Sequence, residues 1–335
     1  MSGVSAPDPT LPADRTPTVV VVGGTGFVGR NACRTLVDAG YRVVALARRA
    51  VDPPAGCQLV GINLATASTD ELAALLRRED PAAVVNAAGA LWPVNGVQMT
   101  DEQLTVSNYT LVDRLVAAVG SLPGRPRLIH LGSTYEYGEQ PPDALLSEST
   151  IEKPFTHYTR TKLASTRTVL AAARSGQVDA TVLRLTTTVG PWAPPSSLFG
   201  QVAHGLAARP EVLQLPALEG ERDLVDVRDV SDAILAAAGS RTVAPLYNIA
   251  SGHIVAISDA VEMLIRLADL PISIAWGPRE THRRDAQLIG SQHIDISAAR
   301  QLPWSPRRTL TDTLAALWRS VQPTGTSQDA ELAGR

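Results

Sequence analysis

Residues 18–29 read TVVVVGGTGFVG, a β-branched apolar run that leads directly into a glycine-rich loop. Three glycines stand three residues apart in this loop, and a segment with helical spacing follows over Asn31–Ala39. A strand, a glycine loop and a helix in this order are typical of a dinucleotide site, because backbone amides and a helix N-terminus can approach the pyrophosphate. The residues that we expect to bind such a cofactor here are Gly23, Thr25, Gly26, Phe27, Val28 and Gly29.

Strand-like and helix-like segments continue to alternate along the chain. The apolar runs predicted as strands are Tyr41–Ala47, Ala82–Asn86, Arg127–Leu131 and Ala180–Leu185. The amphipathic segments predicted as helices are Asp70–Arg78, Leu104–Val119 and Tyr158–Ala173. Continuous apolar strands between amphipathic helices predict an α/β fold, a Rossmann-type doubly wound parallel sheet covered on both faces.

The pattern becomes weaker after Gly190, where the Pro-rich segment PWAPPSSLFG follows. We expect a cofactor-binding domain over 18–190 and about 223–253, and a smaller mixed α/β substrate-binding domain over about 191–222 and 254–320. Residues 1–17 and 321–335 are rich in small and polar residues, which predicts a disordered arm and a tail.

Composition excludes several classes of protein. A net charge of -3 and 4% aromatic residues argue against a nucleic-acid partner. Two cysteines and six scattered histidines predict neither a disulfide framework nor a metal site. The sequence has no apolar run that could cross a bilayer, and its start does not resemble a signal peptide, so we expect a cytoplasmic protein without a membrane partner.

The end of the second predicted strand bears on the choice of cofactor. Arg48 and Arg49 stand where an acid would bind the adenine ribose of NAD. Guanidinium groups suit a 2′-phosphate, so NADP(H) is favoured over NAD(H), unless the two arginines are only a solvated pair. Further contacts to the cofactor are expected from Asn63, Leu64, Ala87, Ala88 and Gly89, which fall at or near the ends of the next strands.

Tyr158 and Lys162 are four residues apart on a predicted helix and therefore share one face. A neighbouring ammonium and an oxidised nicotinamide would lower the pKa of the phenol, which could then exchange a proton with a carbonyl or alcohol oxygen. Ser133, at the end of a strand on the same edge, could hold that oxygen. Asn108 is a candidate for orienting the lysine. We therefore predict Ser133, Tyr158, Lys162 and Asn108 as catalytic residues.

These segments resemble the extended short-chain dehydrogenase/reductases, the NAD-dependent epimerase/dehydratase family that modifies sugar nucleotides. The similarity covers about residues 18–320. It includes the segments GGTGFVG, VVNAAG, GSTYEYG, PFTHYTRTK, LRLTTTVGP, RDLVDVRDV, YNIASG and DISAARQLPWSP. The resemblance implies a Rossmann domain with a smaller sugar-nucleotide domain, the catalytic trio Ser133, Tyr158 and Lys162, and a homodimer.

Local departures from the family pattern narrow the reaction. Dehydratases resemble TDEVYG, whereas this chain has Thr134 and Tyr135 at the places of the acid pair. Glu136 comes one place later and is expected to point the other way, so dehydration is not expected. Thr187 replaces an asparagine that helps hold the nucleotide diphosphate in many members. Arg48 favours a reduction that consumes NADPH.

Substrate contacts are expected at both sides of the cleft between the domains. The residues predicted to make them are Ser133, Thr134, Thr187, Trp192, Arg222 and Arg284. Arg222 is the leading candidate for binding a diphosphate, because guanidinium forms bidentate bonds with phosphate oxygens. A structural ion pair with Asp223 or Asp226 is the alternative for this side chain.

Overall, the sequence is most similar to ketoreductases of deoxysugar pathways. The predicted activity is NADPH-dependent reduction of the keto group of a nucleotide-linked 4-keto-6-deoxyhexose, with dTDP as the expected nucleotide. An NAD-dependent nucleotide-sugar epimerase and a reductase of a non-nucleotide ketone remain alternatives. A non-catalytic NADP sensor is less consistent with the presence of both Tyr158 and Lys162.

Overall fold

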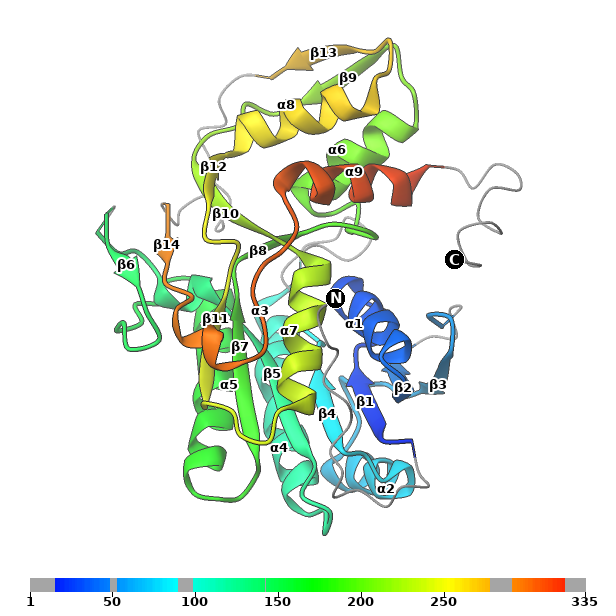
Figure 1. The fold of residues 1–335 in the computed structure, drawn as a ribbon, viewed down its shortest axis with the longest axis vertical. Helices are drawn as coiled ribbons and strands as arrows, with labels where there is room; N and C mark the ends of the chain where they lie inside the picture. The colour runs from blue at the N-terminus through cyan, green and yellow to red at the C-terminus, as the bar shows by residue number, and fades with distance from the viewer. Residues whose placement is uncertain (1–15, 49–52, 90–98, 142, 278–290, 323–335) are drawn as a thin grey trace.

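A computed structural model describes residues 16–48, 53–89, 99–141, 143–277 and 291–322. Its centre is a seven-stranded parallel sheet with the strand order β3-β2-β1-β4-β5-β7-β11 (Figure 1). The strands are β1 (Thr18–Val22), β2 (Arg42–Ala47), β3 (Cys57–Gly61), β4 (Ala83–Asn86), β5 (Arg127–Ser133), β7 (Ala180–Leu185) and β11 (Leu246–Ile249). This architecture confirms the predicted α/β fold class.

Alternate side chains of each strand enter two apolar layers, because successive residues of a strand point to opposite faces. Val19 and Val21 of β1 pack on one side with helices α1 (Phe27–Asp38) and α7 (Val227–Gly239). Val20 and Val22 pack on the other side, where the covering helices are α2 (Thr69–Glu79), α4 (Leu111–Gly120) and α5 (His157–Arg174).

The order of the strands reverses at β1, because β2 and β3 continue the sheet on one side of it and β4, β5, β7 and β11 continue it on the other. Ligands of open α/β sheets bind beyond the carboxyl ends of the strands at such a switch point. The glycine loop after β1 and the segment after β4 meet there, since Ala87 N donates to Val22 O at 3.0 Å. The fold therefore places the predicted cofactor residues side by side.

A second group of elements has its own apolar core and lies at the opposite end of the molecule from α2 and α4 (Figure 1). It contains α6 (Leu198–Ala207), α8 (Ile257–Ala268), α9 (Leu310–Val321) and the parallel pair β9 (Val212–Leu215) and β13 (Ser273–Trp276). Regular helices thus form in the region where the sequence pattern is weak. A three-stranded sheet of β8 (Thr187–Val189), β10 (Glu221–Asp226) and β12 (Ile254–Ala256) contacts helices of both groups. A separate pair of strands is formed by β6 (Leu145–Leu146) and β14 (His293–Ile294).

The predicted helix over Leu104–Val119 is interrupted in the structure. Helix α3 (Asp101–Thr105) runs into a π-helical turn, η1 (Val106–Thr110), before α4 begins. Such turns often occur at functional sites, because they rotate one side chain out of the regular register. Short 3-10 turns, η2 (Thr134–Tyr137) and η4 (Ala298–Gln301), complete the described elements. In the described part of the chain, we find no helix of the length and apolarity that a membrane crossing requires.

Candidate active site

The glycine loop has the close packing that a dinucleotide site needs. Gly23 has a φ of +78°, and a Cβ there would lie 2.9 Å from the Cα of Ala88. A Cβ on Gly29 would overlap the carbonyl oxygen of Gly23. Gly26 is the residue before α1, and within the described residues no side chain caps this helix start. The backbone amides in the first turn of α1 can thus bind a phosphate, so the residues present fit a dinucleotide pyrophosphate.

The first two residues of α1 fix its start between two apolar cores. Phe27 packs against the core of the second group, and Val28 packs against the sheet core on the α1 side. Thr25 is half-buried in the loop between them. The N-terminus of α1 is therefore packed on both sides at the switch point of the sheet.

The predicted contacts to the adenosine half of the cofactor are only partly described. The exposed Arg48 directly follows β2, whereas Arg49 lies outside the described residues. Asn63 Oδ1 accepts a hydrogen bond from Ala65 N at 3.2 Å, so this oxygen shapes its own turn. Leu64 is buried in the core on the α2 side.

The segment after β4 lies beside the predicted catalytic lysine. Ala88 N donates to Asn86 Oδ1 at 3.2 Å, a local bond that shapes the turn after β4. A Cβ on Gly89 would lie 3.4 Å from Asn108 Oδ1 and 4.0 Å from Lys162 Nζ. The absence of a side chain at Gly89 therefore leaves room for a ligand in front of both polar groups.

Ser133 and Tyr158 come together from different elements. Ser133 is the last residue of β5, and Tyr158 lies in the first turn of α5, whose start is fixed by a capping box between Thr156 and Thr159. Burial raises the pKa of Tyr158, and a hydrogen bond with the Ser133 side chain opposes part of this rise. A phenol with a raised pKa remains protonated at neutral pH and can serve as a proton donor.

Lys162 is buried on the same helix. Its Nζ donates to Leu131 O at 2.6 Å, and burial lowers its pKa. The sequence predicted that this ammonium, together with an oxidised nicotinamide, would lower the pKa of Tyr158. Within the protein chain itself, burial raises this pKa, because it disfavours the phenolate more than the hydrogen bond with Ser133 favours it. The joint effect of the ammonium and the cofactor stays a prediction.

Asn108 lies in the π-helical turn and is buried. Its Nδ2 donates to Thr161 Oγ1 at 3.4 Å, next to Lys162 in the sequence. The break in the predicted helix thus turns Asn108 toward α5 and toward Gly89. Asn108 and Lys162 therefore lie around the same point, as expected for a residue that orients the lysine.

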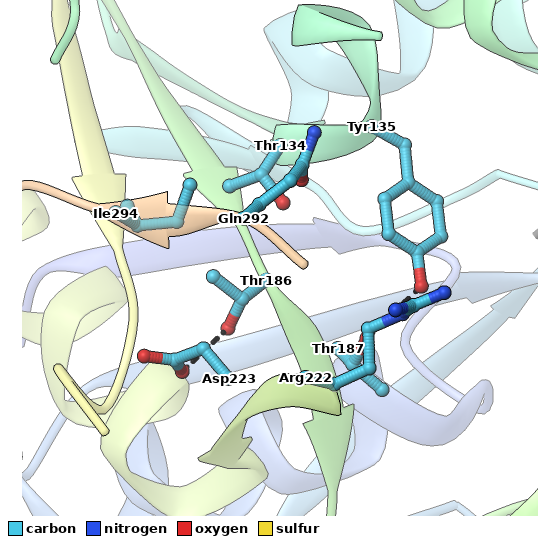
Figure 2. Close-up of a pocket in the computed structure, with 8 residues that line it drawn as sticks. All are labelled: Thr134, Tyr135, Thr186, Thr187, Arg222, Asp223, Gln292 and Ile294. Atoms are coloured by element: carbon cyan, nitrogen blue, oxygen red, sulfur yellow. Dashed lines mark hydrogen bonds between the residues drawn. The ribbon is translucent and has the colours of Figure 1, made fainter. Parts of the chain in front are cut away.

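A small pocket opens beside Thr134, the residue that follows Ser133 in the sequence (Figure 2). The residues that line it are Thr134, Tyr135, Thr186, Thr187, Arg222, Asp223, Gln292 and Ile294. Three predicted substrate residues, Thr134, Thr187 and Arg222, therefore meet at one pocket. In Figure 2 the Arg222 guanidinium lies beside the hydroxyl of Tyr135, which is hydrogen-bonded to Thr187.

The two acids that could have paired with Arg222 are held elsewhere. Asp223 accepts hydrogen bonds from Thr186 Oγ1 at 3.1 Å and from two backbone amides of the loop after β11. Asp226 pairs with Arg228 at 2.6 Å. Arg222 itself is 9% exposed and donates to the carbonyl oxygen of Glu221 at 2.7 Å. Asp223 and Asp226 thus have other hydrogen-bond partners, and diphosphate binding by Arg222 stays a prediction.

Trp192, another predicted substrate residue, does not line this pocket. Trp192 lies with its ring 6.0 Å from the Arg30 guanidinium of α1, and its backbone nitrogen donates to Ser320. Arg284 lies outside the described residues. Gln292 also lines the pocket but is not predicted as a site residue, because it follows a region without a clear sequence pattern. Tyr135 could have been found, since it stands where the dehydratases carry an acid.

A family model for the NAD-dependent epimerase/dehydratase family matches residues 19–250. The chain belongs to this family. The match confirms the resemblance seen in the sequence and makes the protein an NAD(P)-dependent oxidoreductase of the extended short-chain dehydrogenase/reductase type.

Individual relatives of this family member cover nearly its whole length. It is 37% identical over 315 residues to dTDP-6-deoxy-L-talose 4-dehydrogenase (NAD(P)(+)) of Kitasatospora kifunensis, with 92% of this chain and 97% of the relative covered. It is 25% identical to UDP-glucose 4-epimerase of Yersinia pestis, over 92% and 98% of the two chains. The solved structure of MoeE5 in complex with UDP-glucose and NAD is similar with a TM-score of 0.75 at 25% identity, covering 90% of this chain and 98% of MoeE5.

Proposed function

We propose that this enzyme reduces the 4-keto group of a nucleotide-linked 6-deoxyhexose with NADPH, dTDP being the favoured nucleotide. The observation that carries the proposal is the meeting of Ser133 and Tyr158 beside a pocket that contains Arg222. A proton donor and a cation for phosphate thus lie on the same side of the sheet. The 37% identical relative is named for a 4-dehydrogenase of a dTDP-6-deoxysugar, and reduction of the 4-keto group is the reverse of such an oxidation.

The nicotinamide cofactor, when bound at the glycine loop, supplies the hydride that the carbonyl carbon accepts. Tyr158 donates its phenolic proton to the carbonyl oxygen, so that the C=O group becomes an alcohol. Ser133 holds that oxygen by a hydrogen bond while negative charge develops on it. Lys162 and Asn108 lie beside Gly89, where they can bind the ribose hydroxyls of the cofactor.

The pocket residues hold the remainder of the substrate. Arg222 binds the diphosphate by charge-assisted hydrogen bonds. Thr134, Tyr135 and Thr187 offer hydroxyl groups to the sugar or its phosphates. The exposed Arg48 binds the 2′-phosphate of the cofactor, which favours NADPH.

The proposal is tested by incubating the purified protein with a dTDP-4-keto-6-deoxyhexose and either NADPH or NADH. We expect consumption of NADPH with formation of one equivalent of the dTDP-6-deoxyhexose, identified by NMR. Turnover of a dTDP- or UDP-hexose without added cofactor, by protein that releases NAD on denaturation, would identify an epimerase instead. Absence of calorimetric binding of dTDP and UDP would indicate a ketone without a nucleotide.

The division into a cofactor-binding and a substrate-binding domain and the cytoplasmic location remain predictions from the sequence, and the homodimer remains a prediction of the resemblance. Light scattering at the concentrations used for the assay would measure the number of subunits.

A further inference from the structure

Glu136 lies next to the catalytic residues with a fully buried side chain. Its Oε1 accepts hydrogen bonds from the backbone nitrogen of Ser133 at 2.8 Å and from Thr166 Oγ1 of α5 at 3.0 Å. Its Oε2 is 3.0 Å from Nη2 of Arg184 in β7. One carboxylate therefore connects the strand that carries Ser133, the helix that carries Tyr158, and a third element of the sheet.

Burying the charges of Glu136 and Arg184 costs free energy, because both groups lose contact with water. Arg184 is also fully buried, donates to Glu152 at 3.0 Å, and lies with its Cζ 4.4 Å from the Tyr137 ring centre. Within the described residues, the Nη1 atom of Arg184 has no hydrogen-bond partner. Apolar residues of similar volume are often as stabilising as a buried ion pair. Stability alone therefore does not account for a charge at this place.

We propose that Glu136 is a positioning residue for the Ser133–Tyr158 pair. It holds the Ser133 backbone so that the hydroxyl faces Tyr158, and it places a buried negative charge beside the phenol. This inference rests on the proposed reductase function, in which Tyr158 must carry its proton at the start of each turnover.

The groups that act on Tyr158 or Lys162 come from three elements. They are Glu136 and Tyr135 of η2, Ser133 and His130 of β5, and Lys162 of α5 itself; Arg184 of β7 reaches them through Glu136. Burial raises the pKa of Tyr158, and the charge of Glu136 raises it further. The same charge also raises the pKa of Lys162, where burial acts in the opposite direction. Glu136 thus favours a protonated phenol beside a protonated amine.

Two double variants separate the backbone contact from the charge. In Glu136→Gln/Arg184→Met, both charges are gone but an amide oxygen can still accept from Ser133 N. In Glu136→Met/Arg184→Met, the acceptor is lost as well. Removing both partners together avoids an unpaired buried charge, so both variants are expected to fold. Circular dichroism and thermal melting check this, and Glu152 keeps its contact with Arg167.

We expect the Gln/Met variant to keep kcat at neutral pH within a few-fold and to lose activity at alkaline pH about one unit earlier, since a neighbouring charge shifts a pKa by roughly this amount. The Met/Met variant should show the same shift and a further loss of about tenfold or more in kcat, with little change in KM for either substrate. Two folded variants with wild-type kcat and a wild-type pH profile would overturn the proposal.

Two further measurements keep the result specific. The matched control is Asp229→Asn/Arg308→Met, which removes an ion pair between helix α7 and the segment before α9, with 2.5 Å between its charged atoms. This variant should change the stability of the protein but not the pH profile of kcat. The phenolate absorption of each double variant, minus that of the same variant with Tyr158→Phe, reports the titration of Tyr158 without substrate. A midpoint that does not move would contradict the proposal even if the protein reduces no sugar.

Discussion

The hydroxyl of Tyr135 lies 3.0 Å from Oγ1 of Thr187, although 52 positions separate the two residues. Each residue departs from the family pattern, Tyr135 at the place of a dehydratase acid and Thr187 at the place of an asparagine. The structure joins the two departures into one hydrogen-bonded pair in the wall of the pocket, beside Arg222 (Figure 2). The two substitutions therefore belong to one feature of the site.

This pair is expected to act as a unit in substrate binding. Tyr135→Phe and Thr187→Val should each raise KM for the nucleotide sugar by about fivefold, the order of one lost hydrogen bond of roughly 1 kcal/mol, with a smaller effect on kcat. The double variant should be little worse than either single variant, because each removes the same bond. Initial rates at saturating NADPH measure this. Fully additive effects would show that the two hydroxyls act independently.

The pH dependence should differ in sign between the two directions of the reaction. Reduction needs the phenol and oxidation needs the phenolate, and burial raises the pKa of Tyr158 above its ordinary value. Reduction is thus expected to stay constant from neutral pH past about pH 10, the ordinary pKa of a phenol, and to fall only at higher pH, whereas oxidation rises with pH over this range.

The control for this prediction is Tyr158→Phe, which is expected to lower kcat by roughly 10²–10⁴-fold in both directions while NADPH binding persists. Stopped-flow rates at saturating cofactor give the profiles, and NADPH fluorescence gives the binding. If the residual activity of Tyr158→Phe kept the same alkaline limb, another group would be responsible for it.

Cofactor preference should depend on the arginines after β2. Replacing Arg48 with Glu is expected to raise KM for NADPH by about tenfold or more, since a charge-assisted bond to the 2′-phosphate is lost. The KM for NADH should change much less. Arg34→Ala, at an exposed arginine of α1 that pairs with Asp38 at 3.9 Å, is the control. If the ratio of KM for NADPH to KM for NADH were unchanged in both Arg48→Ala and Arg49→Ala, the predicted 2′-phosphate contact would be contradicted.

The glycine loop offers a matched pair of substitutions. Gly29→Ala places a methyl group against the Gly23 carbonyl oxygen, so the loop or α1 must shift. We expect a lower melting temperature and weaker NADPH binding by about tenfold or more, since a well-packed site is overfilled. Gly61→Ala, at the end of β3, meets nothing within 4 Å and should leave both quantities unchanged. Equal behaviour of the two variants would show that close packing at Gly29 is unimportant.

Sequence reasoning was most informative where local pattern and local structure coincide. The strands before Gly23 and Ser133 are buried on both faces, so their apolar runs were visible without tertiary information. The predicted helix over Leu104–Val119 hid the π-helical turn at Asn108, because hydrophobic spacing does not reveal a single wider turn. The elements after Gly190 were also indistinct, since they pack into a separate core whose partners are far apart in the chain.

The sequence by itself determined the parallel α/β fold, and it predicted the cofactor loop and catalytic roles for Ser133, Tyr158 and Lys162, because motifs at fixed spacing on known elements carry that information. Only the tertiary structure decided that Tyr135 forms a hydrogen bond with Thr187 and that Arg222 lines the same pocket. It also decided that Glu136 accepts a hydrogen bond from the Ser133 backbone. These are contacts between strand ends and turns brought together by the sheet order. Their strength depends on distance and burial, which no local pattern encodes.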